Sequence, residues 1–233
     1  MPTPFETASD GSPLSWVGRN SPAGGTTEIT LAPAQFNYPQ DKNIAPTISA
    51  PLSPAEQTLL HAAVHVWELI SNVHFDFVDD TPPSTFVAQP VPDIRVGLSM
   101  LNAGLTQPSM GFVGLTNVQW NANNKLIPDA VVGIEDPVDH PVVALNDGDF
   151  GYKGTTTTMF QSMIHELGHA IGLDHNPNDR TSIMNPIIGA NNPLPDDQDI
   201  AAVQKLYGAP TQPLNISPAE TTVLAGLLNA AIG

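Results

Sequence analysis

Apolar residues recur at helical spacing in the first half of the chain, and this pattern predicts its first long helix. From Leu59 to Ile70, apolar side chains follow one another every three or four residues, as in an amphipathic helix with one buried face. The segment Ser53-Pro-Ala-Glu56 comes directly before this run. Serine followed by proline and then, at the third helical position, by glutamate is a helix-capping box. The sequence therefore predicts a helix over residues 54–70.

Shorter apolar runs, separated by Pro and Gly clusters, predict strands in the rest of this half. These runs cover residues 27–31, 73–78, 93–98, 111–120 and 130–135. Helical spacing returns later and predicts helices over residues 159–171, 199–206 and 217–232. Gly172 is expected to end the first of these three helices and Gly208 to cap the second.

Composition supports a folded protein with many loops. The chain has 233 residues, 41% of them hydrophobic and only 13% charged, so it can bury a core and does not resemble a disordered chain. Its 24 prolines and 18 glycines indicate extensive loops. The net charge of −16 argues against nucleic acid and anionic membranes as partners. No apolar run approaches the roughly 20 residues of a membrane span.

Cysteine is absent from the sequence, which excludes disulfides, thiolate metal sites and a thiol nucleophile. The first residues, MPTPFETASDGSP, contain neither a basic region nor an apolar region, so no Sec-type signal peptide is visible.

The strongest chemical signal is the segment HELGHAIGLDH, which begins at His165. On a helix, His165 and His169 are one turn apart and can reach one metal ion, with Glu166 beside them. A straight helix would carry His175 out of reach, but Gly172 can adopt a left-handed turn that brings the chain back. Three histidine ligands leave a fourth position open for water, as in catalytic zinc sites. The alternative is a helix with ordinary surface histidines.

A second histidine pair serves as an internal comparison. His61 and His65 have the same spacing on the first predicted helix, but no glutamate follows His61 and the sequence offers no third ligand for the pair. For this pair the sequence favours a packing or solvated role.

The eleven-residue motif resembles the signature of the metzincin zinc endopeptidases, which a methionine turn follows. Met184, nine residues after His175, is the candidate for this turn. The order of segments from Thr27 to Gly208 resembles the catalytic domain of matrixins and of the related serralysins. The resemblance implies an α+β, zincin-like fold with a twisted, mostly parallel sheet, a backing helix, an active-site helix and a small C-terminal subdomain with one helix.

The expected domain limits follow from this resemblance. Residues 1–25 are expected to form an irregular leader and residues 26–209 the catalytic domain. Within that domain, residues 26–172 would form the upper subdomain and residues 173–209 the lower one. Residues 210–233 would form a linker and a helical tail, for which we favour docking on the domain.

Some features leave the subfamily open. Asn176 follows the third histidine, where matrixins usually have serine and serralysins proline. The segment after Met184 lacks the tyrosine of serralysins, and the glycine-aspartate repeats of that family do not follow. Without cysteine, a cysteine switch of the matrixin type is excluded.

The resemblance implies hydrolysis of peptide bonds by a metal-activated water, with Glu166 as the general base. It also implies an edge strand and a wall segment that bind an extended peptide, with a preference for a hydrophobic residue after the cut. The candidates are Gly111, Phe112, Val113 and Gly114 for the edge strand, and Pro186 and Ile187 for the wall.

Two alternatives remain open at this stage: a non-catalytic zinc-binding module of the same fold, and a zinc hydrolase acting on a small amide. The retained Glu166 argues against the first. Asp147 and Asp149 offer closely spaced oxygens for Ca²⁺, although a solvated turn explains them as well. The expected partners are protein or peptide substrates, and the expected protein is a secreted monomer, exported by a non-Sec route or trimmed.

Overall fold

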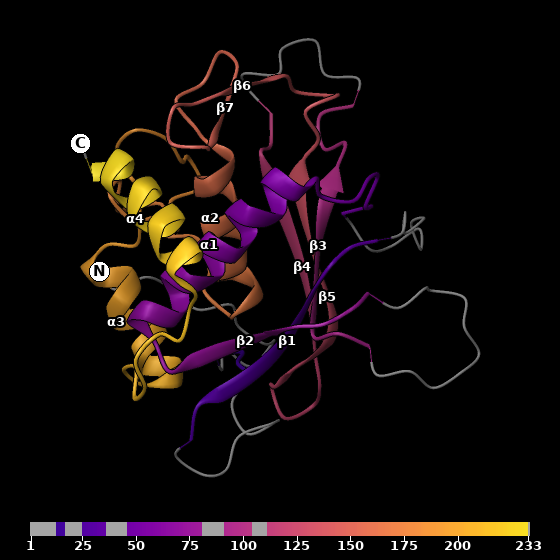
Figure 1. The fold of residues 1–233 in the computed structure, drawn as a ribbon. Coiled ribbons are helices and arrows are strands. Elements are labelled where there is room, and N and C mark those ends of the chain that lie inside the picture. The colour runs from indigo at the N-terminus through magenta and orange to yellow at the C-terminus, as the bar shows by residue number, and fades with distance from the viewer. Residues whose placement is uncertain (1–12, 17–24, 36–45, 81–90, 104–110, 233) are drawn as a thin grey trace.

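The computed structural model describes residues 13–16, 25–35, 46–80, 91–103 and 111–232 (Figure 1). A five-stranded sheet forms one layer, and helices α1 and α2 cover one side of it. Helices α3 and α4 lie beyond them, on the side away from the sheet. Within the described residues, no helix is long and apolar enough to cross a bilayer.

The sheet has the order β2-β1-β3-β5-β4. Every neighbouring pair is parallel except β4 and β5, which are antiparallel. The predicted mostly parallel sheet is therefore confirmed, and β4 is one of its two edges. The strands are β1 (Thr27–Pro33), β2 (Val73–Phe77), β3 (Ile94–Ser99), β4 (Gly114–Trp120) and β5 (Leu126–Glu135).

Helix α1 (Pro54–Ile70) has the predicted bounds, and both hydrogen bonds of the capping box at Ser53 are present. Its Trp67 is completely buried, and the indole Nε1 donates to the carbonyl of Ile164 at 3.0 Å. Ile164 belongs to α2 (Met159–Ala170), which Thr158 and Gln161 cap in the same way. A polar contact inside an apolar interface thus fixes α1 against α2.

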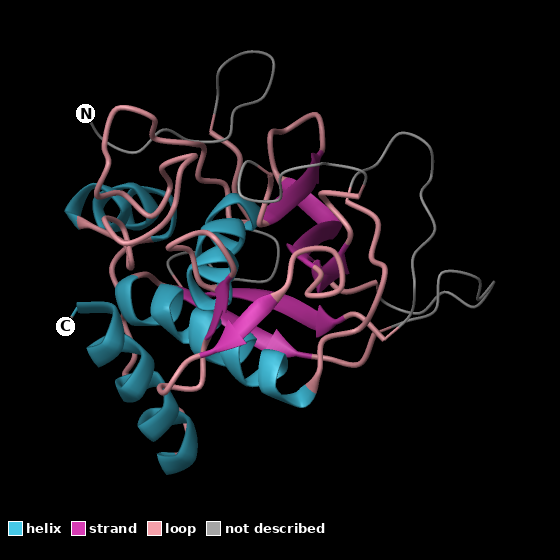
Figure 2. Ribbon diagram, turned by 90° about the horizontal axis from the view of Figure 1, so that it is seen from above, coloured by secondary structure: helices cyan, strands magenta, loops and turns pink. Residues whose placement is uncertain are grey.

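The two C-terminal helices also begin with capping boxes. Helix α3 (Asp197–Tyr207) starts two residues before the predicted position because the side chain of Asp196 accepts from two backbone N–H groups of its first turn. Gly208 follows it with φ +87°, as expected for a C-cap. Helix α4 (Pro218–Ile232) packs against α1 and buries Leu224 and Leu227. Figure 2 shows this C-terminal helix on the outside of the molecule, away from the strands.

The strands also differ from the prediction in several places, and β5 begins at Leu126, four residues before the predicted position. The hairpin of β6 (Val142–Ala144) and β7 (Phe150–Tyr152) was not predicted, because strands of three residues are too short to show a period. The strand predicted at residues 111–120 begins only at Gly114. The side-chain amide of Asn102 exchanges two hydrogen bonds with the backbone of Phe112, at 2.6 and 2.7 Å, so this backbone is held by a side chain and not by a neighbouring strand.

Part of the segment interpreted as a leader lies in the core. Leu14 and Trp16 are each 1% exposed. The Trp16 indole donates to the carbonyl of Ala170 at the end of α2, and its backbone N–H donates to the hydroxyl of Tyr207 in α3. Residues 13–16 therefore connect the ends of two helices, whereas residues 1–12 and 17–24 lie outside the described part of the chain.

Candidate metal centre and active site

His165 and His169 project from the same face of α2, and both are buried. Each ring has its Nδ1 atom close to a backbone carbonyl: His165 to Ile183 at 2.6 Å and His169 to Leu173 at 2.7 Å. Because a carbonyl can only accept, both Nδ1 atoms carry the hydrogen. These bonds fix the orientation of each ring and leave its Nε2 atom as the candidate ligand.

The two Nε2 atoms lie 3.1 Å from each other. Burial lowers the pKa of His165 well below its usual value, and the neighbouring His169 lowers it further. In neutral rings, both Nε2 atoms present lone pairs, which repel at this distance unless a cation lies between them. Ligand atoms in a tetrahedral zinc site with bonds of about 2.0–2.1 Å are roughly 3.3 Å apart. The donor pair therefore fits a zinc ion.

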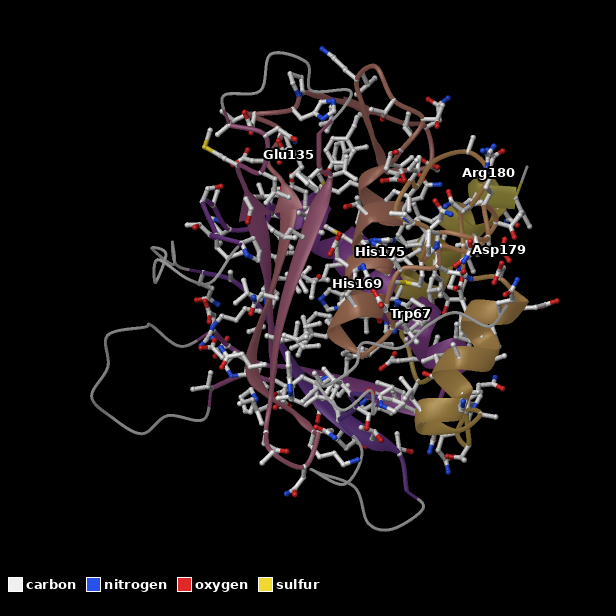
Figure 3. All side chains as sticks on the ribbon, turned by 180° about the vertical axis from the view of Figure 1, so that it is seen from behind. Trp67, Glu135, His169, His175, Asp179 and Arg180 are labelled. Carbon is white, nitrogen blue, oxygen red and sulfur yellow. The ribbon has the colours of Figure 1, made fainter. Side chains whose placement is uncertain are left out.

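His175 reaches the same place through the turn at Gly172. This glycine has φ +98°, and a Cβ atom there would lie only 2.4 Å from the carbonyl oxygen of Leu14. The turn brings the His175 ring centroid within 4.6 Å of that of His169 and 5.3 Å of that of His165. Figure 3 shows His169 and His175 side by side. Each of the three histidines offers one nitrogen within 4.8 Å of the other two.

Glu166 is buried next to this cluster and is held by β4. The hydroxyl of Thr116 donates to its Oε2 at 2.7 Å, and a Cβ atom at Gly114 would come within 2.4 Å of its Cγ. Glycine at position 114 therefore makes the room that the Glu166 side chain occupies. Burial raises the pKa of Glu166, while His169 and the Thr116 hydrogen bond act in the opposite direction. Sequence reasoning missed the role of Thr116, since only the fold brings β4 to α2.

Met184 is completely buried beneath α2. A Cβ atom at Gly168 would lie 2.5 Å from its sulfur, so the glycine between the two helical histidines allows this close approach. Asp199 of α3 anchors the turn by accepting from the Ser182 hydroxyl at 2.6 Å and from the Ile183 N–H at 2.8 Å. The sequence contained no signal for this role of Asp199, which depends on a contact between two distant segments.

Comparison with known families identifies the domain. The sequence profile of the matrixin peptidases, family M10, matches residues 47–208. This chain belongs to the matrixin family. A segment of 64 residues is 47% identical to the macrophage metalloelastase of Oryctolagus cuniculus and covers 26% of this chain and 13% of that protein. A segment of 56 residues is 46% identical to matrix metalloproteinase-16 of Homo sapiens and of Rattus norvegicus, covering 22% of this chain and 9% of each relative.

The prediction of a matrixin-type zincin fold is thus confirmed, whereas the serralysin side of the resemblance gains no support. The matched segments span only about a tenth of these relatives' own length. In the matrixin domain, Asn176 ties the segment of His175 to that of Met184, because its N–H donates to the carbonyl of Met184 at 2.8 Å. Asn185 completes the connection by donating to the carbonyl of Asn176 at 3.1 Å.

The candidate substrate residues flank the site of this matrixin domain. The carbonyl of Val113 accepts from the N–H of Glu135 in β5, so the next residue, Gly114, directs its backbone away from β5. Phe112 is 64% exposed and Ile187 82% exposed, and Pro186 is exposed as well. Gly111 lies two residues before Val113 and outside β4.

The candidate calcium residues, Asp147 and Asp149, already have protein partners. The N–H of Asp149 donates to the Asp147 carboxylate at 3.1 Å. Asp149 is buried, which raises its pKa, and it accepts from the N–H groups of Phe150 and Phe160. Within the described residues, no third histidine or carboxylate joins these two in a metal-sized cluster. The contacts explain Asp149 as a residue that orders the start of α2.

Proposed function

We propose that this matrixin domain is a zinc-dependent endopeptidase. The single observation that carries the proposal is the cluster of His165, His169 and His175 with the buried Glu166 directly beside it. Three imidazoles leave one coordination position open for chemistry. Family membership supports the same conclusion.

The three histidines and Glu166 would have different roles in hydrolysis. A zinc ion held by the three histidines supplies Lewis acidity, which polarises the scissile carbonyl and acidifies water. Glu166 accepts the proton of the attacking water and delivers it to the departing amine. The Thr116 hydroxyl holds the Glu166 carboxylate at one oxygen, so the other oxygen is available for this transfer. A serine or cysteine nucleophile is not required.

An extended peptide substrate would bind along the free edge of β4. Gly114 and Thr116 direct their backbone groups to this edge, where a substrate strand can pair with them. Gly111, Phe112 and Val113 would extend the edge, and Pro186 and Ile187 would form the wall of the pocket for the residue after the cut. We expect that residue to be hydrophobic.

Incubation of the purified chain with casein, with and without a zinc chelator, tests the proposal. We expect fragments without chelator, none with it, and recovery when zinc is restored. Intact casein in every sample would contradict the proposal. Cleavage of a small amide with casein left intact would identify a small-amide hydrolase, and no hydrolysis of either would identify a non-catalytic zinc module.

We further propose that the catalytic domain spans residues 26–209, with the buried residues 14–16 packed into its core. The domain is divided at Gly172 into an upper and a lower subdomain and followed by the tail of residues 210–233. The end of the family match at residue 208 supports the C-terminal limit of the domain.

We also propose that the protein is a secreted monomer. Light scattering on the purified chain tests the oligomeric state, and assay of the culture medium of its source tests secretion.

Calcium at Asp147 and Asp149 is a separate proposal, since the two carboxylates are two residues apart in one turn, where the Asp147 carboxylate contacts the backbone of Asp149. Added Ca²⁺ should then raise the melting temperature, and Asp147→Ala should remove the effect. The same melting temperature with and without Ca²⁺ in both proteins would contradict calcium binding here.

A further inference from the structure

The second histidine pair, His61 and His65, lies on the part of α1 that α4 covers. Figure 1 shows α4 running beside α1. The pair has the spacing of His165 and His169, and the fold adds a residue that the sequence does not suggest as a neighbour. This residue is Glu220, in the first turn of α4.

The two carboxylate oxygens of Glu220 have different neighbours. Oε2 accepts from the backbone N–H of Ser217 at 2.8 Å and so caps α4. Oε1 lies 3.7 Å from His61 Nδ1 and 3.8 Å from His65 Nε2. Both distances are longer than a hydrogen bond. One oxygen therefore faces two ring nitrogens without bonding to either.

His65 gives an independent indication of a ligand. Its Nδ1 is 2.7 Å from the carboxylate of Glu68, so Nδ1 carries the hydrogen, and in the neutral ring Nε2 then presents a lone pair. This Nε2 atom is buried, with the residue 8% exposed, and it has no hydrogen-bond partner. An acceptor without a partner is costly in a protein interior. A carboxylate on the far nitrogen of an imidazole is a common arrangement around metal-binding histidines.

The other members are also held in place. The His61 ring stacks on Phe77 with centroids 3.8 Å apart and planes 7° from parallel. Glu68 is fixed by the N–H of Phe75, which donates to its second oxygen at 2.9 Å. Two ring orientations are thus set by the fold, while Glu220, which is partly exposed, can adjust.

We propose that His61, His65 and Glu220 form a second metal site, for a divalent transition-metal ion such as Zn²⁺, between α1 and α4. Each residue offers one ligand atom, and the three atoms lie within 4.8 Å of one another. Zinc bonds of about 2.0–2.2 Å require roughly 3.4 Å between ligand atoms, and a small movement of the Glu220 side chain shortens its separations of 3.7 and 3.8 Å from the two ring nitrogens to this value. A site with two imidazoles and one carboxylate favours zinc over calcium or magnesium.

The site joins the last helix of the chain to the first, so a bound ion clamps α4 onto the domain. It lies outside the cluster of His165, His169 and His175 and does not depend on the function proposed above. Because the ion binds only when α4 is docked, zinc should also hold α4 in its docked position.

Zinc content after equilibrium dialysis of the full chain at a fixed free-zinc concentration tests the proposal. We expect two zinc ions per wild-type chain and one in Glu220→Gln, in which glutamine keeps the capping box. His61→Phe, which keeps a ring on Phe77, should also bind one. Both variants should cleave peptides at the wild-type rate.

Asp76→Asn is the matched control, because Glu28, His74 and Asp76 form another, more exposed cluster of candidate ligands. It should retain two ions. The same zinc content in the wild-type chain, in Glu220→Gln and in His61→Phe would overturn the proposal, whatever the number of ions.

Hydrogen exchange of α4 is the second readout. Zinc should slow exchange of its amides at least several-fold in the wild-type chain and leave Glu220→Gln unaffected. Equal slowing in both proteins would contradict the clamp.

Discussion

Two helices that pack against each other, α1 and α2, each carry a pair of histidines one turn apart. On α2, both rings donate to backbone carbonyls and are joined by His175, which the turn at Gly172 brings back to the helix. On α1, one ring is bonded to Glu68 and the other stacks on Phe77, and the third group is Glu220, from the opposite end of the chain. The two histidine pairs thus have the same spacing in sequence but different neighbours in the fold.

The difference shows what the spacing means chemically. Both pairs can contribute two ligands to a metal and both have a buried glutamate nearby, but the glutamates differ: Glu166 is held by the Thr116 hydroxyl of β4, whereas Glu68 is bonded to the His65 ring itself. The α1 pair instead connects two helices. The i,i+4 spacing allows two histidines to share a metal ion, and the residues around the pair determine whether such a site can catalyse a reaction or only hold elements together.

The largest effect should separate the two pairs by activity. His169→Ala should lower kcat/KM for a peptide by roughly 10³-fold or more, because it removes a ligand of the catalytic metal. His65→Ala, at the corresponding place on α1, should stay within about threefold of wild type, because no atom of that pair takes part in the reaction. Peptide hydrolysis below the melting temperature of each variant measures both. An equal loss in a folded His65→Ala protein would contradict the separation.

The next prediction concerns the turn that supplies the third ligand of the α2 pair. Gly172→Ala should destabilise the protein by about 2–4 kcal/mol, because its positive φ is strained and the new Cβ meets the Leu14 carbonyl. Gly148→Ala is the control: it has a similar φ of +92° with nothing within 4 Å, so it should cost only about 1–2 kcal/mol. Urea denaturation measures both, and equal costs would show that the contact with Leu14 does not matter.

A smaller loss of activity should follow when the hydrogen bond that orients Glu166, beside the α2 pair, is removed. Thr116→Val should lower kcat by roughly tenfold, because Glu166 loses the hydroxyl that orients it. Zinc content should not change. Thr116→Ser, which keeps the hydroxyl, should restore most of the rate, and failure of serine to do so would argue against a positioning role.

The smallest effect should be confined to the α1 pair. Gly226 is an exposed glycine in α4 with open space around it, so Gly226→Ala should stabilise this helix by about 0.5–1 kcal/mol. Hydrogen exchange should slow in α4 and stay the same in α2. Slower exchange in α2, or a change in peptide hydrolysis, would show that the two regions are coupled.

Local patterns were sufficient for most of the fold. The bounds of α1, its capping box and the glycines after α2 and α3 were predictable, because helix ends depend on neighbouring residues. The mostly parallel sheet followed from the family resemblance. The hairpin β6–β7 and the late start of β4 were not predictable, since three-residue strands and the Asn102 side chain leave no periodic signal.

The same limit applies to the site. The histidine cluster with Gly172 lies within eleven residues, so the sequence alone suggested it. Thr116, Asp199 and Glu220 act on groups that are distant along the chain, and only the folded structure brings them together. A motif can suggest the candidate metal ligands and the candidate general base. It does not reveal the distant residues that orient them, because those are brought close only by folding.

The most direct test of the proposed function is Glu166→Ala, assayed for zinc content and for peptide hydrolysis in the same preparation. The variant should bind as much zinc as the wild-type protein and hydrolyse peptides about 10²–10⁴-fold more slowly, since the ligands are intact and only the general base is lost. Hydrolysis near the wild-type rate by the zinc-loaded variant would contradict the role of Glu166 and the mechanism built on it.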